Sequence, residues 1–239
     1  YNNAISLATD ANSIFLKDLD KYRTDYVYSL MIMASCYSGL WEEGKALQLV
    51  SNAIDIYRET FDERDLLYAH LLLYQANLHH FFKNVDEAIR LATKAIDIQK
   101  QFLGDNNLEY ASSLNRLASY YSSIEKYDKA IPLLRKAMAI TADKDQYQYS
   151  DLLNTLTDIY EKKGNIDEAI QLLKESQQLL RKYVCNNEDQ YGLLLYTGTL
   201  IRLASCYKSK EEYNEAVQLD TEALEITYQL YGKNNPFYA

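Results

Sequence analysis

Glycine and proline are scarce in this chain of 239 residues, which contains seven glycines and two prolines. An all-β fold needs many tight turns, and these two residues supply many of them. Their scarcity therefore argues against an all-β fold and favours long helices. Cysteine is scarce as well: the three cysteines are odd in number and widely spaced, which predicts no disulfide framework. Such thiols fit a reducing compartment, so we expect a cytoplasmic location.

Basic residues are outnumbered by acidic ones, with 25 Lys+Arg against 34 Asp+Glu and a formal net charge of −9. Proteins that bind nucleic acid need clustered Lys and Arg to displace counterions from phosphates. An electrostatic hold on an anionic membrane needs the same clusters. No run approaches the roughly 18 apolar residues of a membrane span. The sequence thus predicts no nucleic-acid partner and no membrane contact for this chain.

Motifs for catalysis and for cofactor binding are missing too. The glycines are scattered and form no phosphate-binding loop, and neither HExxH nor CxxC occurs. His79 and His80 are adjacent, so on a helix they point in different directions. Cys36 and Cys206 could act as nucleophiles beside a histidine, but they occupy a column of large apolar residues and are expected to pack. We therefore expect no catalytic residue, no metal, no cofactor and no enzymatic activity.

An internal repeat is what the sequence does contain. Five segments align with one another when the chain is compared with itself, and their starting points are 42, 42, 39 and 47 residues apart. The uneven intervals fall near 143–146 and 185–189, where changes in loop length leave packed helices undisturbed. The segments start at Tyr26, Tyr68, Tyr110, Tyr149 and Tyr196.

Aligned columns of the repeats have the spacing of helix faces. Tyrosine is followed by leucine four residues on, then by a small residue and an aromatic one, as on one face of a helix. A second helix carries alanines seven residues apart, which let paired helices approach closely. One helix pair cannot bury its apolar stripe alone, so stacking of neighbours must supply the core. The tyrosine columns explain much of the count of 23 tyrosines.

One repeat shows the pattern most clearly, at Leu114, Leu117, Ala118, Tyr121, Ala130 and Ala137. This spacing resembles a tetratricopeptide (TPR) repeat, although the period of about 42 falls in the range of HEAT and armadillo repeats. The extra residues lie between repeats, which favours the TPR interpretation. The segment is similar to the long repeat of kinesin light chains and to arrays in bacterial proteins that end in a caspase-like CHAT domain. The resemblance implies an all-α, right-handed superhelical solenoid of antiparallel helix pairs.

A single solenoid is expected over residues 1–239, and both ends of the sequence fall inside repeat units. We therefore expect a fragment of a longer protein. The expected units are the second helix of a preceding repeat over 1–20, five repeats over 24–60, 66–104, 108–143, 147–184 and 189–232, and the start of a further repeat over 233–239.

The resemblance also implies a binding surface, because the first helices of TPR pairs line a concave groove. Here those columns hold amides, hydroxyls and a few charges. Asparagine both donates and accepts, so it can bind the backbone of an extended peptide of any sequence. Ordinary exposed polar residues are the alternative interpretation. The candidate partner-binding residues are Tyr74, Asn77, Asn115, Arg116, Ser119, Asn154, Asp158 and Arg202.

Two functions fit this pattern. The first is a non-catalytic scaffold that binds a peptide or helix of a protein partner in the concave groove. The second is a sensory or regulatory arm of a larger enzyme, a caspase-like CHAT protease or a sensor kinase, whose catalytic domain lies outside this sequence. Arg116 and Arg202 share a column two repeats apart, so basic residues do not form the carboxylate clamp of chaperone-binding TPRs.

Overall fold

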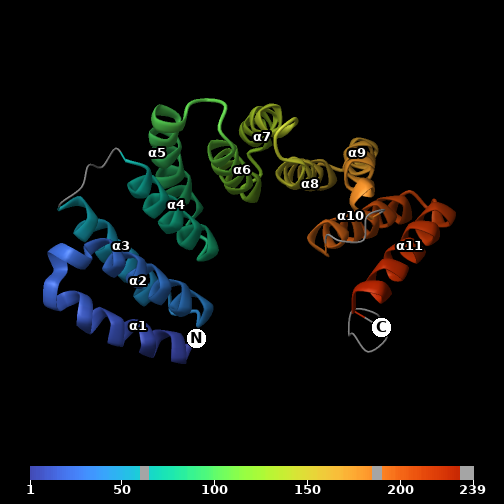
Figure 1. The fold of residues 1–239 in the computed structure, drawn as a ribbon. Helices are drawn as coiled ribbons and strands as arrows, with labels where there is room; N and C mark the ends of the chain where they lie inside the picture. The colour runs from blue at the N-terminus through green and yellow to red at the C-terminus, as the bar shows by residue number, and fades with distance from the viewer. Residues whose placement is uncertain (60–64, 185–189, 232–239) are drawn as a thin grey trace. The chain divides into compact units, whose positions relative to one another are not determined.

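The computed structural model describes residues 1–59, 65–184 and 190–231, which form helices joined by turns and contain no strand (Figure 1). The chain divides into two compact units, Tyr1–Lys126 and Tyr127–Ala239. The predicted fold class, all-α and built from paired helices, is confirmed over these residues. Cys185 and the expected further repeat at 233–239 lie outside the described part of the chain.

The first unit begins with a helix that precedes the first complete pair. Consecutive helices pack against each other from α1 through α6, so neighbouring helices run antiparallel. A short 3-10 helix joins α1 to α2, and α2 is kinked at Tyr22, which has φ −110° and ψ 19°. The elements are α1 (Asn2–Phe15), η1 (Leu16–Asp18), α2 (Leu19–Gly39), α3 (Glu43–Arg58), α4 (Leu66–Phe81), α5 (Val85–Leu103) and α6 (Leu108–Ser123).

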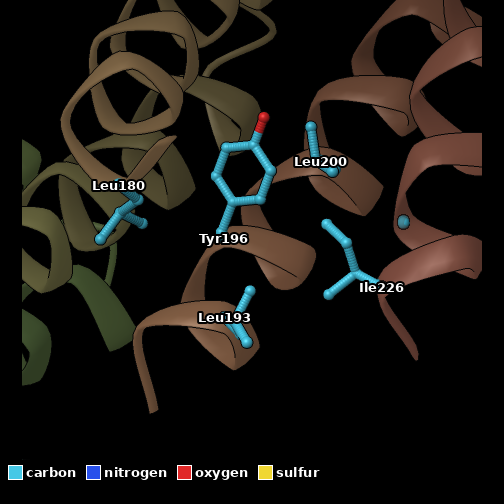
Figure 2. Packing of buried hydrophobic residues seen from close by; sticks show 6 residues of the cluster. Leu180, Leu193, Tyr196, Leu200 and Ile226 are labelled. Carbon is cyan, nitrogen blue, oxygen red and sulfur yellow. The ribbon is translucent and has the colours of Figure 1, made fainter. Parts of the chain in front are cut away.

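The second unit continues in the same way, and its consecutive helices also pack in sequence order. Figure 2 shows part of its core, where Leu180 of α9, Tyr196 of α10 and Ile226 of α11 meet. The Tyr196 side chain is 1% exposed. The elements are α7 (Tyr127–Thr141), α8 (Gln146–Lys162), α9 (Ile166–Val184), α10 (Gln190–Ser209) and α11 (Tyr213–Tyr231).

Tyrosines at the start of the first helices are packed by their rings and hydrogen-bonded by their hydroxyls. Lys94 Nζ donates to Tyr68 Oη at 3.1 Å, and Tyr196 Oη donates to Glu222 Oε1 at 2.7 Å. Each bond joins a first helix to the second helix of the same pair. A buried hydroxyl without a partner is costly, so these bonds explain why tyrosine, rather than phenylalanine, suits the column.

The turn between the two helices of a pair has the same form wherever it is described. One turn residue is in the left-handed region with φ between 59° and 76°. The next residue donates its backbone N–H to the carbonyl five residues earlier at 2.8–2.9 Å, as in a Schellman cap. Glycine occupies only one of these left-handed positions, which are Trp41, Lys83, Glu125, Gly164 and Glu211.

Candidate partner-binding site

A pocket of about 310 Å³ lies between the helices of the first unit, and we call it the α4–α6 trough. Residues of α2 and α5 complete it, but α4 and α6 supply most of the lining. Each contributes four residues at the i, i+3, i+4, i+7 spacing that defines one face of a helix. The lining from α4 is His70, Leu73, Tyr74 and Asn77, and that from α6 is Glu109, Ser112, Ser113 and Arg116.

One end of the trough is acidic and has a buried amide at its floor. Gln99 of α5 is fully buried, and its Nε2 donates to Glu109 Oε1 at 2.7 Å. His70 Nε2 lies 2.5 Å from the same oxygen. A carboxylate only accepts, so the amide nitrogen of Gln99 must face Glu109. Its oxygen Oε1 is then left without a hydrogen-bond partner among the described residues.

The other end of the trough is basic. Arg116 is exposed and forms no ion pair with any residue that the structure describes. It follows Glu109 by two turns of α6, a rise of about 10 Å. The predicted residue Asn115 does not line the trough, and its buried Oδ1 accepts no hydrogen bond within the described ranges. The trough thus combines opposite charges at its two ends with unused hydrogen-bonding groups.

Two other predicted residues connect successive first helices. Tyr74 Oη donates to the backbone oxygen of Met31 at 3.0 Å, which joins α4 to α2, and burial raises the pKa of Tyr74. Tyr120 Oη donates to Asn77 Oδ1, which joins α6 to α4, and burial raises the pKa of Tyr120 to about 12. The amide N–H groups of Asn77 have no acceptor among the residues that the structure describes. Ser119 of α6 is partly exposed.

The predicted residues of the second unit bind one another. Arg202 of α10 donates from Nη1 to the Asn154 backbone oxygen at 3.2 Å and to Asn154 Oδ1 at 3.4 Å. Its Nη2 lies 2.5 Å from Asp158 Oδ1 and 3.2 Å from Glu161 Oε2. Burial raises the pKa of Asp158, although the charge of Arg202 acts in the opposite direction. Arg202 therefore cross-links α10 to α8.

Cys206, at the edge of this cluster, is poorly suited to act as a nucleophile. Cys36 and Cys206 are both buried and free. The Cys206 thiol donates to Glu161 Oε1 at 3.4 Å, and burial together with this hydrogen bond raises its pKa to about 11. A nucleophile needs the thiolate. The described residues also contain no group of three or more His, Cys, Asp or Glu able to hold a metal ion.

The sequence did not single out His70, Gln99 or Glu109 as binding residues. Gln99 lies on a second helix, whereas the predicted groove residues all lie on first helices. Its aligned column also contains Thr141 and Leu180, and all three residues are fully buried. A glutamine in a buried column was the available signal, because a buried amide needs partners.

Comparisons with protein-family models agree with the helix pairs. Tetratricopeptide repeat models match residues 71–143 and 199–230. The chain therefore contains TPR repeats. Two further models match parts of it: anaphase-promoting complex subunit 5 over residues 5–75, and the PPR repeat over residues 152–179. A comparison with curated protein sequences gives no significant match.

Solved structures resemble this TPR protein over most of its length. BtubC (BKLC) from P. vanneervenii is 19% identical with a TM-score of 0.81, over 98% of this chain and 94% of BtubC. A putative kinesin light chain from Podosopora anserina, with nearly identical TPR-like repeats, is 19% identical with a TM-score of 0.71, over 86% and 96%. A Rap protein complexed with Competence and Sporulation Factor is 14% identical with a TM-score of 0.67, over 93% and 59%. At these identities, the likeness concerns the fold alone.

None of the described helices combines the length and the apolar character that crossing a membrane requires.

Proposed function

We propose that this TPR protein is a non-catalytic interaction scaffold, and that α4 and α6 hold an extended segment of a partner protein. The α4–α6 trough is the observation that carries the proposal. Arg116 and Gln99 line it and have hydrogen-bonding capacity that no other described residue uses. Unsatisfied polar groups beside a hollow favour a ligand over a purely structural role. The Rap protein, which was solved as a complex, supports a complex-forming role for this fold.

An extended segment fits this surface better than a helix does. A bound helix would present an apolar stripe to an apolar groove. The trough is instead lined mainly by imidazole, amide, hydroxyl and charged groups, with Leu73 and Met31 as its apolar members. The amide N–H groups of Asn77, which have no acceptor among the described residues, suit the carbonyl groups of an extended backbone.

RNA is a less suitable ligand than a peptide. The PPR match over residues 152–179 raises this alternative, because PPR repeats read RNA bases. Binding of RNA relies on neutralising phosphates with Lys and Arg, whereas this chain has a net charge of −9. The regulatory arm of a larger enzyme stays a prediction, because an arm and a scaffold would use the same surface.

A library of displayed random ten-residue peptides, panned against the full chain, tests the proposal. Retained peptides should lose about one to two decades of affinity for Arg116→Ala, because hydrogen bonds to a charged group contribute about 1.5–3 kcal/mol. Arg90→Ala is the matched control, since it removes an exposed guanidinium that pairs with Glu87 on α5. Equal affinity for Arg116→Ala, or retention of a random RNA library instead of peptides, would contradict the proposal.

A further inference from the structure

We infer that the α4–α6 trough selects a lysine or arginine side chain of the bound peptide at Glu109, next to an acidic group of the same peptide at Arg116. This inference rests on the proposed function and specifies the peptide chemistry that the trough recognises.

The Glu109 end requires a ligand that donates hydrogen bonds. Glu109 Oε1 already accepts from Gln99, while Oε2 has no partner within the described ranges. Gln99 Oε1, at the fully buried floor, also lacks a donor. Both open positions are acceptors, and one belongs to a carboxylate. Ammonium and guanidinium groups carry several donors and no acceptor, and their hydrogen bonds to a carboxylate are charge-assisted.

The lining beside Glu109 suits the aliphatic stem of a basic side chain. Leu73 is 7% exposed, and it lines the trough together with Met31 of α2. Lysine and arginine commonly lay their methylene groups along apolar surface and keep the charged group at a polar site. A small neutral donor, such as a serine hydroxyl, would leave this apolar lining uncovered. The net charge of −9 also attracts a basic peptide over a longer range.

The Arg116 end sets the second requirement. Its guanidinium is exposed and has no ion-pair partner among the residues described. Arginine binds a carboxylate with two parallel hydrogen bonds. The rise of about 10 Å between Glu109 and Arg116 equals about three residues of extended chain. The acidic group, a side chain or a terminal carboxylate, should therefore lie within about three residues of the basic one.

The sequences of the retained peptides give the first test. Peptides retained by the wild-type chain should be enriched in Lys or Arg with an acidic group within three residues. Glu109→Gln removes the charge and keeps an acceptor oxygen, so it should abolish the basic preference. Asp97→Asn is the matched control, because Asp97 is exposed on the same α5 helix as Gln99 and the substitution removes one carboxylate. It should leave the preference unchanged.

Changes on the peptide side give a second test that needs no altered protein. Replacing the selected lysine by norleucine keeps the stem and removes the charge. Affinity for the wild-type chain should fall about tenfold to a hundredfold, the scale of a hydrogen bond to a charged group. Replacing the peptide's Asp by Asn should weaken binding to the wild-type chain, but should have little further effect on Arg116→Gln. A double-mutant cycle measures this coupling.

The outcomes separate the inference from the proposed function. Peptides retained without a basic preference, or with one that survives Glu109→Gln, would overturn the inference and leave the scaffold intact. Equal affinities for the lysine and norleucine peptides would also overturn it, and would indicate that water occupies the acidic end. A chain that retains no peptide would overturn both.

Discussion

One first helix in each unit carries an arginine in the same aligned column, but the two arginines differ in their contacts. Arg202 in the second unit binds Asn154, Asp158 and Glu161 of the preceding first helix. Arg116 in the first unit forms no ion pair with any residue in the described part of the chain. The aligned positions on α4 are Leu73, Asn77 and His80, and none of them carries a carboxylate. A shared column therefore does not fix a role; the charges on the neighbouring helix do.

This difference separates a structural face from an available one. In the second unit the arginine is 27% exposed, and its donors are used within the protein. In the first unit the donors point into a region with a hollow and with unsatisfied acceptors. These unused groups are the reason why the proposed binding site lies on the first unit.

The largest effect should come from the cores, where the two units are expected to behave alike. Tyr68→Ala and Tyr196→Ala each remove a ring that is at most 3% exposed. Each should lower the free energy of unfolding by about 3–5 kcal/mol through the cavity that remains. Urea denaturation measures this loss. Tyr213→Ala is the control, since that ring is 61% exposed, and it should cost within about 0.5 kcal/mol. A large difference between the first two variants would show that the cores of the two units do not respond alike.

A smaller effect concerns the thiol in the second unit. Its raised pKa of about 11, against an ordinary 9.0, lowers the thiolate fraction of Cys206 about a hundredfold at pH 8. Alkylation by iodoacetamide, followed by mass spectrometry, should be at least that much slower in the native chain than in urea. The native rate should keep rising beyond pH 9 instead of levelling off. Fast native labelling at pH 8 would show that Glu161 does not hold the thiol.

Removal of each arginine tests the contrast directly. Arg202→Met should lower the free energy of unfolding by about 1–3 kcal/mol, because it removes the guanidinium that donates to Asp158 Oδ1 and Glu161 Oε2. Arg116→Met should change it by no more than about 0.5 kcal/mol. Equal losses in urea denaturation would mean that Arg116 also has a structural partner.

The loss caused by Arg202→Met should also depend on pH. Burial already raises the pKa of Asp158, and the variant lacks the charge that opposes this shift. A raised carboxyl pKa in the folded state stabilises the protein below the unfolded pKa, and this contribution is lost as the pH rises through the folded pKa. The deficit of the variant should therefore shrink between pH 7 and pH 4.

The smallest effect on stability should come from giving α4 of the first unit the acidic residue that α8 of the second unit carries. Asn77→Asp places on α4 the acid that α8 has at Asp158, and the new carboxylate can still accept from Tyr120. A pair with Arg116 should stabilise the fold by about 0.2–1 kcal/mol, and 1 M salt should remove the gain. The same variant should lose its preference for acidic groups in panned peptides. An unchanged preference would show that Arg116 does not read them.

Much of the fold was predictable because packing constrains residue size at regular intervals. The alanines that begin the second helices, such as Ala88 and Ala169, are fully buried where helices touch. The exact helix starts were less predictable. The Asp65, Asn107 and Asp145 side chains cap α4, α6 and α8 by accepting from backbone N–H groups, but the repeat columns did not single them out. The start of α2 at Leu19 follows a 3-10 helix, which adds a turn without an apolar period.

The site was only partly predictable. Tyr74, Asn77 and Arg116 were expected on one face, and they do line one trough. The pairing of Arg202 was not foreseen, because its partners lie 41–48 residues earlier in the sequence. Which acids such an arginine reaches depends on side-chain rotamers and on the relative position of two helices. Neither quantity can be read from a column of residue types.

The turns between paired helices give an engineer a separate means of control. Left-handed backbone costs an L-residue roughly 1–2 kcal/mol relative to its usual conformations, and glycine avoids this cost. Four of the five turns hold Trp41, Lys83, Glu125 or Glu211 at that position, and only Gly164 is already relieved. Glycine at those four sites would relieve this strain in the folded state. The greater conformational freedom of the unfolded chain would cancel part of the gain in stability. A longer-lived version of this scaffold could thus be built at its corners, without altering any side chain that lines the trough.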